Sequence, residues 1–131
     1  MTYLRWVESD YEEIEFTLPK PPSLNAFYSG RHFMVRKKYK EDYWKHIENA
    51  LESFDRFYMD KFALDVSFNC RFDVDNAICC SKFLADYLRK FEYVKDDNPK
   101  HFISQSTTFN ENLEKNTFRV KIKVYGFKTI E

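Results

Sequence analysis

The chain contains very little glycine: its 131 residues include only two. This scarcity argues against a loop-rich architecture and against a glycine-rich loop that cradles phosphates. No apolar run approaches the roughly 18 residues that a membrane-spanning helix needs. The N-terminal segment also lacks the basic and then apolar layout of a secretory signal. These absences predict a cytoplasmic protein that does not associate with a membrane.

Cysteine and histidine are too few and too scattered for a zinc site. The three cysteines are Cys70, Cys79 and Cys80, and the three histidines lie singly in the sequence. Structural zinc sites need regularly spaced pairs of such residues, so we expect none here. An odd number of cysteines suits reduced thiols better than a disulfide framework. We therefore expect these side chains to serve in packing.

Aromatic and charged residues are plentiful. The 14 Phe and nine Tyr residues give a chain of this length enough apolar mass for a real core. The net charge is zero, whereas nucleic-acid binders usually carry an excess of basic residues. The charges are unevenly distributed, because residues 8–15 are mostly acidic and residues 31–45 are mostly basic. A neutral protein with a basic face can still bind a polyanion.

The periodicity of apolar residues predicts an α+β fold. Alternation predicts four strands, at 11–18, 63–72, 101–109 and 117–125. Helical spacing predicts two main helices, at 38–58 and 76–90. The turn-like run from Asn110 to Asn116 indicates that the last two strands form a hairpin. We expect one domain over residues 1–131, in which a small mixed β-sheet packs against the two helices.

A cluster of acidic residues follows the strand predicted at 63–72. Asp73 and Asp75 stand at its C-terminal end, where side chains at i and i+2 point the same way. Asp96 and Asp97 come on the turn after the helix predicted at 76–90, and we expect them to fold back beside the first pair. Hard oxygen ligands with no Cys or His nearby favour Mg²⁺ or Mn²⁺. Such a cation can activate water against a phosphodiester and stabilise the leaving oxygen.

A simpler interpretation stands beside the metal site. Asp75 or Asn76 can serve as the N-cap of the second helix. The sequence Asp-Asp-Asn-Pro, from Asp96 to Pro99, is also a good turn. Taken one at a time, these structural roles are the commoner ones. Together they do not explain why a strand of the buried type ends in paired acids.

These acidic residues belong to a longer motif that resembles the signature of the RusA family of phage and prophage Holliday-junction resolvases. The motif residues are Asp73, Asp75, Asn76, Lys82, Asp86, Leu88, Asp96 and Asp97. Upstream, the run from Pro21 to Asn25 resembles the Pro-Pro-Ser-x-Asn element of the family. In the commoner family pattern a lysine follows the asparagine by three residues, and this chain has Cys79 there. Lys82 lies three residues later, about 4.5 Å along a helix, and is our candidate for that lysine.

The resemblance implies a Mg²⁺-dependent endonuclease, with Mn²⁺ able to substitute, that nicks Holliday junctions and related branched DNA. It implies a homodimer that acts in recombination or phage DNA processing in the cytoplasm of a bacterial host, without a small-molecule organic cofactor. In this picture Asp73, Asp75 and Asp97 bind the metal, Lys82 is catalytic, and Asp96 is a further ligand or a helper. The expected DNA contacts are Arg31, Arg36, Lys37, Lys38, Lys40, Arg71 and Asn76.

Two other functions stay open. One is a catalytically inactive module of the same fold that binds DNA junctions, for which the displaced lysine and the neutral charge leave room. Retention of Asp73, Asp75 and Asp97 speaks against it, since an inactive site has no need of three clustered acids. The other is a phage interaction protein that uses the fold only as a scaffold. The basic run at 31–45, and the basic face of the strand at 117–125, also suit an ordinary solvated surface.

Overall fold

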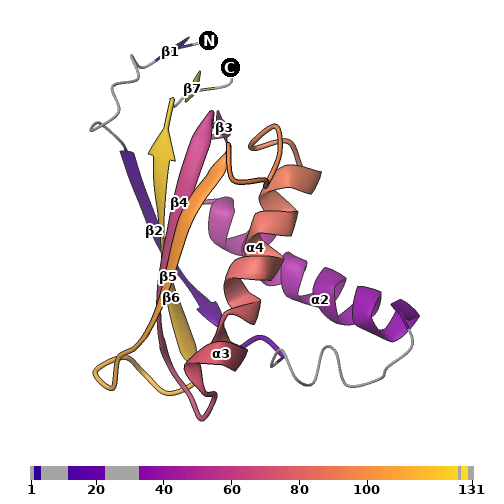
Figure 1. Ribbon diagram of the computed structural model, residues 1–131, viewed down its shortest axis with the longest axis vertical. Coiled ribbons are helices and arrows are strands. Elements are labelled where there is room, and N and C mark those ends of the chain that lie inside the picture. The colour runs from indigo at the N-terminus through magenta and orange to yellow at the C-terminus, as the bar shows by residue number, and fades with distance from the viewer. Residues whose placement is uncertain (1, 4–11, 23–32, 127, 130–131) are drawn as a thin grey trace.

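Four strands form a mixed sheet with helices on one of its faces, as the computed structural model in Figure 1 shows. The structure describes residues 2–3, 12–22, 33–126 and 128–129. The strands of this sheet are β2 (Glu12–Pro19), β4 (Lys61–Asn69), β5 (Phe102–Phe109) and β6 (Thr117–Tyr125). The helices are α2 (Phe33–Leu51), α3 (Val74–Ala77) and α4 (Cys79–Lys90). Three short strands, β1 (Thr2–Tyr3), β3 (Phe57–Tyr58) and β7 (Lys128–Thr129), form a second sheet in the order β1-β7-β3.

The strand predicted at 117–125 is confirmed as β6. Its apolar residues Phe118, Val120, Ile122 and Val124 are buried on the face that the helices cover. The residues between them are half-buried on the other face, so the alternation in the sequence matches the two environments. The strand predicted at 11–18 is likewise present as β2, one residue further along the chain.

The predicted hairpin between the last two strands is wrong. The order of the sheet is β2-β6-β4-β5, so β4 lies between β5 and β6. β5 pairs with β4 in parallel, and β6 pairs with β4 antiparallel on its other side. The connection at 110–116 passes the end of β4 and is held there, because the amides of Asn110 and Asn116 donate to the carbonyl oxygens of Phe68 and Asn69.

The first predicted helix is misplaced at both ends. The prediction was 38–58, whereas α2 begins at Phe33 and ends at Leu51. Leu51, Phe54 and Tyr58 keep helical spacing, but the amide of Phe54 donates to the carbonyl of Leu51 in a turn. The chain then enters β3, where the fully buried Phe57 precedes Tyr58. Helical spacing of apolar residues therefore continued past the point where the backbone leaves the helix.

The boundary between the third strand and the second helix also differs from the prediction. β4 ends at Asn69, so Asp73 does not stand at the end of the strand that we placed at 63–72. The second helix begins earlier, as the single turn of α3, and continues as α4 after Ile78. At its other end, Phe91 lies just beyond α4 and is exposed, although we expected it to be buried.

The core lies between the helices and the face of the sheet that they cover. Ile47 of α2 and Leu84 and Leu88 of α4 are completely buried in the same apolar cluster as the inward residues of β4 and β6. The indole nitrogen of Trp44 donates to the carbonyl oxygen of Phe83 at 3.0 Å, which links the two long helices. This arrangement confirms the α+β class, with a mixed sheet and two main helices. None of the described helices is long and apolar enough to cross a membrane.

Candidate nucleic-acid interface

Asp73 and Asp75 lie at the start of α3. Asp73 is the N-cap residue, with an extended backbone, and its carbonyl oxygen accepts hydrogen bonds from the amides of Asn76 at 2.9 Å and Ala77 at 3.0 Å. Its carboxylate makes no capping hydrogen bond, and the side chains of both aspartates are exposed. The simpler interpretation that Asp75 or Asn76 is the N-cap is therefore wrong. Asn76, which we expected to contact DNA, is half-buried in the first turn.

Asp96 and Asp97 lie in the connection between α4 and β5. The amide of Asp97 donates to Oδ1 of Asp96 at 2.7 Å, and the side-chain amide of Asn98 donates to Oδ2 at 3.2 Å. The guanidinium Nε of Arg89 lies 3.6 Å from Oδ1 of Asp96. The hydrogen bond from Asp97, together with Arg89, lowers the pKa of Asp96. The Asp96 carboxylate thus closes the turn that follows α4.

Asp86, which we named only as part of the motif, is near Asp97. Burial raises the pKa of Asp86, and the charge of Asp97 adds to the rise. Two lysines lower the pKa of Asp86 and so counteract part of this rise. The ammonium of Lys40 on α2 lies 3.9 Å from Oδ2 of Asp86, and Lys82 lies one turn before Asp86 on α4. Lys82, our candidate for the family lysine, is therefore near Asp86. Cys79, at the position of the commoner family lysine, is buried.

The two acidic pairs lie at opposite ends of the sheet. β4 and β5 are parallel, so the connection through α3 and α4 leaves from one end of the sheet and returns to the other. Figure 1 shows α3 and the loop after α4 at opposite ends of α4. This helix has 12 residues and is about 18 Å long. The expectation that Asp97 folds back beside Asp73 is not met.

The carboxylates named from the motif do not form one metal centre within this chain. Across residues 2–3, 12–22, 33–126 and 128–129, no group of three or more Asp, Glu, His or Cys side chains could hold a metal ion. Asp73 and Asp75 remain a pair at the start of α3, whereas Asp97 lies with Asp86. The roles of these residues as metal ligands stay predictions.

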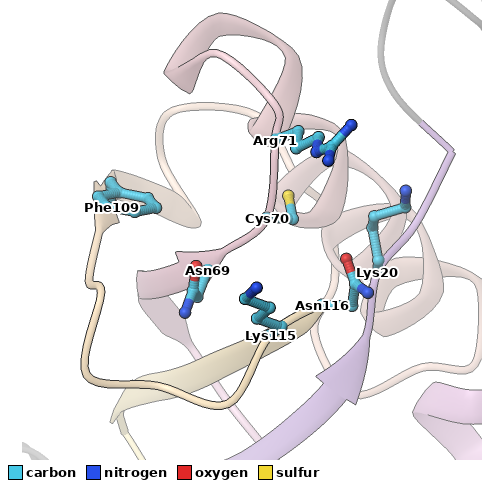
Figure 2. A pocket seen from close by; sticks show the side chains of 7 residues that line it. All are labelled: Lys20, Asn69, Cys70, Arg71, Phe109, Lys115 and Asn116. Atoms are coloured by element: carbon cyan, nitrogen blue, oxygen red, sulfur yellow. The ribbon is translucent and has the colours of Figure 1, made fainter.

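A basic pocket opens at the end of the sheet where Asp73 and Asp75 lie (Figure 2). It has a volume of about 520 Å³ and is lined by Lys20, Asn69, Cys70, Arg71, Phe109, Lys115 and Asn116. Three of these side chains are cationic and none is acidic. In the part of the chain that the structure describes, no carboxylate lies within salt-bridge distance of the three cations. The pocket therefore suits an anionic ligand.

Hydrogen bonds hold the wall of the basic pocket. The side-chain amide of Asn69 donates to the carbonyl oxygen of Leu113 at 2.6 Å, and the amide of Asn116 donates to the carbonyl oxygen of Asn69 at 2.6 Å. Both bonds attach the 110–116 connection to the end of β4. On the opposite side, the ammonium of Lys20 lies 5.1 Å from the ring centroid of Phe72. Several segments thus fix the shape of the pocket in the free protein.

Of the pocket residues, our sequence interpretation named only Arg71 as a DNA contact. The others come from the end of β2, the ends of β4 and β5, and the 110–116 connection. Each is an ordinary polar or aromatic residue near a strand end, so no local pattern marks it. Only the strand order, which places the ends of β2, β4, β5 and the start of β6 together, could have found the pocket.

The basic residues of α2 are largely matched by acids. Lys37 lies 3.8 Å from Glu41, and Lys38 lies 3.1 Å from Asp42, each one turn along the same helix. Lys40 is the partner of Asp86 described above. Arg36 is half-buried on α2, and Arg31 lies outside the described residues. This pairing weakens the case for α2 as a basic DNA-binding face.

The basic face of β6 is matched in the same way. Nε of Arg119 and the ammonium of Lys121 lie 3.7 Å and 4.0 Å from Oε1 of Glu15, on the neighbouring strand β2. Such exposed pairs reduce the positive potential that a polyanion meets. The basic pocket is therefore the better candidate surface for DNA.

No family model matches this chain, and no curated protein is significantly similar to it in sequence. Membership of the RusA family stays a prediction from the motif.

Proposed function

We propose that this protein binds branched DNA and nicks it as a Mg²⁺-dependent endonuclease of the RusA type. The observation that carries the proposal is the location of Asp73 and Asp75 at the same end of the sheet as the basic pocket. Lysine and arginine side chains bind the phosphates of DNA, and they provide most of the affinity. A DNA strand held in the pocket passes close to the two exposed carboxylates.

The two aspartates supply part of what a magnesium ion requires. In phosphate-processing sites Mg²⁺ is commonly held by one or two carboxylates together with water and oxygens of the substrate phosphate. Asp73 and Asp75 offer hard oxygen ligands of this kind beside the pocket. A bound Mg²⁺ supplies an acidified water and a positive charge for the leaving oxygen. Asp97 of the same chain lies in the connection after α4, at the other end of the sheet, so the proposal gives it no role in holding this ion.

A junction-binding protein without nuclease activity is the second candidate. It is favoured by the separation of Asp97 from Asp73, because the three acids do not form a common site. Lys82 also lies near Asp86 rather than in the basic pocket. DNA binding through the pocket is common to both candidates, and they differ only in whether the strand is cut.

An assay with two DNA substrates separates these candidates. A labelled four-way junction and a linear duplex of the same sequence are each incubated with the protein, with and without Mg²⁺. Native gels report binding, and denaturing gels report nicking. We expect selective binding of the junction in both conditions and nicking only with Mg²⁺. Selective binding without nicking would support the second candidate, and neither activity would leave only a scaffold role.

Symmetrical nicking of a four-way junction also predicts a homodimer. Two cuts on opposed strands require two active sites related by a two-fold axis. Sedimentation at micromolar concentration should therefore give twice the chain mass of 16.0 kDa. A monomer at every concentration, with or without junction DNA, would contradict this part of the proposal.

A further inference from the structure

We infer that the basic pocket binds one unpaired nucleotide of a DNA strand, with its phosphate on the three cations and its base against Phe109. This inference rests on the proposed function for the choice of DNA as ligand. The pocket itself, its charge and its aromatic residue are independent of whether the protein cuts DNA.

The size of the pocket suits a single nucleotide. Small-molecule sites in proteins have volumes of about 300–1,000 Å³, and this pocket has about 520 Å³. A DNA duplex is far too wide to enter such a space. One nucleotide turned out of a strand, with flanking phosphates on the rim, is the ligand that fits both the volume and the charge.

The three cations approach the pocket from separate segments. Lys20 follows β2, Arg71 follows β4, and Lys115 precedes β6. Figure 2 shows Lys20 and Arg71 on one side of the pocket and Lys115 across the open space from Arg71, with its side chain directed toward Asn69. Because several chain segments hold these residues, the cations are gathered before a ligand arrives. A phosphate group that enters meets positive charge from two sides.

Phe109 provides the aromatic surface. It ends the edge strand β5, and half of its side chain is exposed although it is large and apolar. Its ring packs edge-on against the buried Phe68, with centroids 5.7 Å apart, so its position is fixed. Bases stack on such exposed rings, and any base can do so. In a duplex the bases are stacked on one another, so this ring selects unpaired bases, which become available where the base pairs beside a branch point open.

Binding of a short oligonucleotide without Mg²⁺ tests the inference. The probes are a fluorescein-labelled thymidine hexanucleotide and a labelled blunt duplex hairpin whose loop is a non-nucleotide linker, so that it contains no unpaired base; both are measured by fluorescence anisotropy. The variants are Lys115→Gln and Phe109→Leu, both at exposed positions of the pocket. The matched controls are Lys100→Gln and Phe91→Leu, which are exposed at the other end of α4 and outside the pocket.

The parent protein should bind the hexanucleotide more tightly than the hairpin. Each pocket variant should weaken hexanucleotide binding at least about fivefold, while each control changes it less than about twofold. Lys115→Gln should also lower the slope of log K against log salt by about 0.7, since it removes one phosphate contact to a single strand. Phe109→Leu should leave that slope unchanged, because it removes stacking and no charge.

Other outcomes overturn specific parts. Pocket variants that bind like the controls, in a parent that nicks junctions, would overturn the pocket and leave the proposed function standing. Pocket-dependent binding in a parent that cuts nothing with Mg²⁺ would support the pocket and overturn the nuclease. Equal binding of hairpin and hexanucleotide would overturn the preference for an unpaired base. If Phe109→Leu fails to fold, the affinity of Lys115→Gln for the hexanucleotide and its salt slope alone decide whether the pocket is the binding site.

Discussion

The hydroxyl of Tyr43 on α2 donates a hydrogen bond of 2.7 Å to the carbonyl oxygen of Pro19 at the end of β2. Tyr43 is buried, and burial holds its pKa well above the ordinary value, so the hydroxyl keeps its proton. The bond joins a helix to the strand that precedes the pocket residue Lys20. Tyr43→Phe should lower the free energy of unfolding by about 1 kcal/mol, measured by urea denaturation. An unchanged midpoint would show that water replaces the hydroxyl at no cost.

Neutralising the aspartates at the start of α3 should stop cleavage without unfolding the protein. Asp73→Asn and Asp75→Asn are nearly isosteric changes at exposed positions, but each removes a charge and a strong ligand for Mg²⁺. We expect nicking of a four-way junction to slow at least about a hundredfold, which corresponds to about 2.7 kcal/mol of barrier. Without metal, each variant should bind the junction at least as tightly as the parent, because less negative charge opposes the phosphates.

Asp97→Asn belongs in the same experiment. The sequence motif predicts a loss equal to that of Asp75→Asn, whereas within one chain Asp97 lies beside Asp86 and at the other end of the sheet from Asp73 and Asp75. Equal losses in all three variants would mean that Asp97 reaches the site in the assembled complex. A folded Asp75→Asn protein that nicks at the parental rate would end the catalytic assignment of α3.

Lys82→Ala should slow single-turnover nicking substantially, by at least about tenfold. The resemblance to the RusA family implies that its ammonium contacts a phosphate oxygen whose charge grows in the transition state, so the change should affect rate more than folding. Lys82 is exposed, and stability should change little. Lys90→Ala, an exposed lysine at the end of the same helix, is the matched control. Parental rates in both variants would show that Lys82 has no role in catalysis.

Asp86 should make stability depend on pH in a definite direction. Burial raises its pKa in the folded state above the ordinary 3.8, so the folded protein binds this proton more tightly than the unfolded chain. The free energy of unfolding therefore falls as the pH rises from 3.8 through the raised pKa, because Asp86 must ionise in its buried position in the folded protein. Relative to the parent, Asp86→Asn should gain stability over that interval. Urea unfolding at several pH values measures the difference, and a difference that does not vary with pH would contradict the prediction.

The three thiols should react very differently. Burial raises the pKa of Cys79 and of Cys80 to about 12, whereas Cys70 is half-buried and lines the pocket. A thiol with such a pKa has only about one part in 10⁵ as thiolate at neutral pH. A colorimetric thiol reagent should label one cysteine per folded chain quickly and all three after denaturation. Fast labelling of two or three in the folded protein would contradict the burial of the adjacent pair.

The strands were predictable where each face of the sheet has a constant environment. In β6 every second residue is apolar because one face packs on the helices and the other does not, and such a pattern is visible in the sequence. The order of the strands is not local information. A connection of the length of 110–116 can close a hairpin or pass over a neighbouring strand, and only the packing of β4 decided between them.

The candidate site was predicted less well for a related reason. The motif names Asp73 and Asp75, and the structure places these two exposed carboxylates at the start of α3. Whether Asp97 joins them depends on the direction of β5, since the parallel pairing with β4 places the Asp97 turn at the opposite end of the sheet. The basic pocket was missed because its residues come together only when four strand ends meet.

The strand order also determines when this protein can fold. β6 is the last of the four main strands in the sequence, yet it lies inside the sheet between β2 and β4. Glu12 pairs with Val124, so β2 has no neighbouring strand in this sheet until the residues of β6, as far as Val124, have been synthesised. Pairing over such a sequence separation is slow. During translation, β4, α3, α4 and β5 can assemble first, and the completed sheet forms only after β6 has left the ribosome.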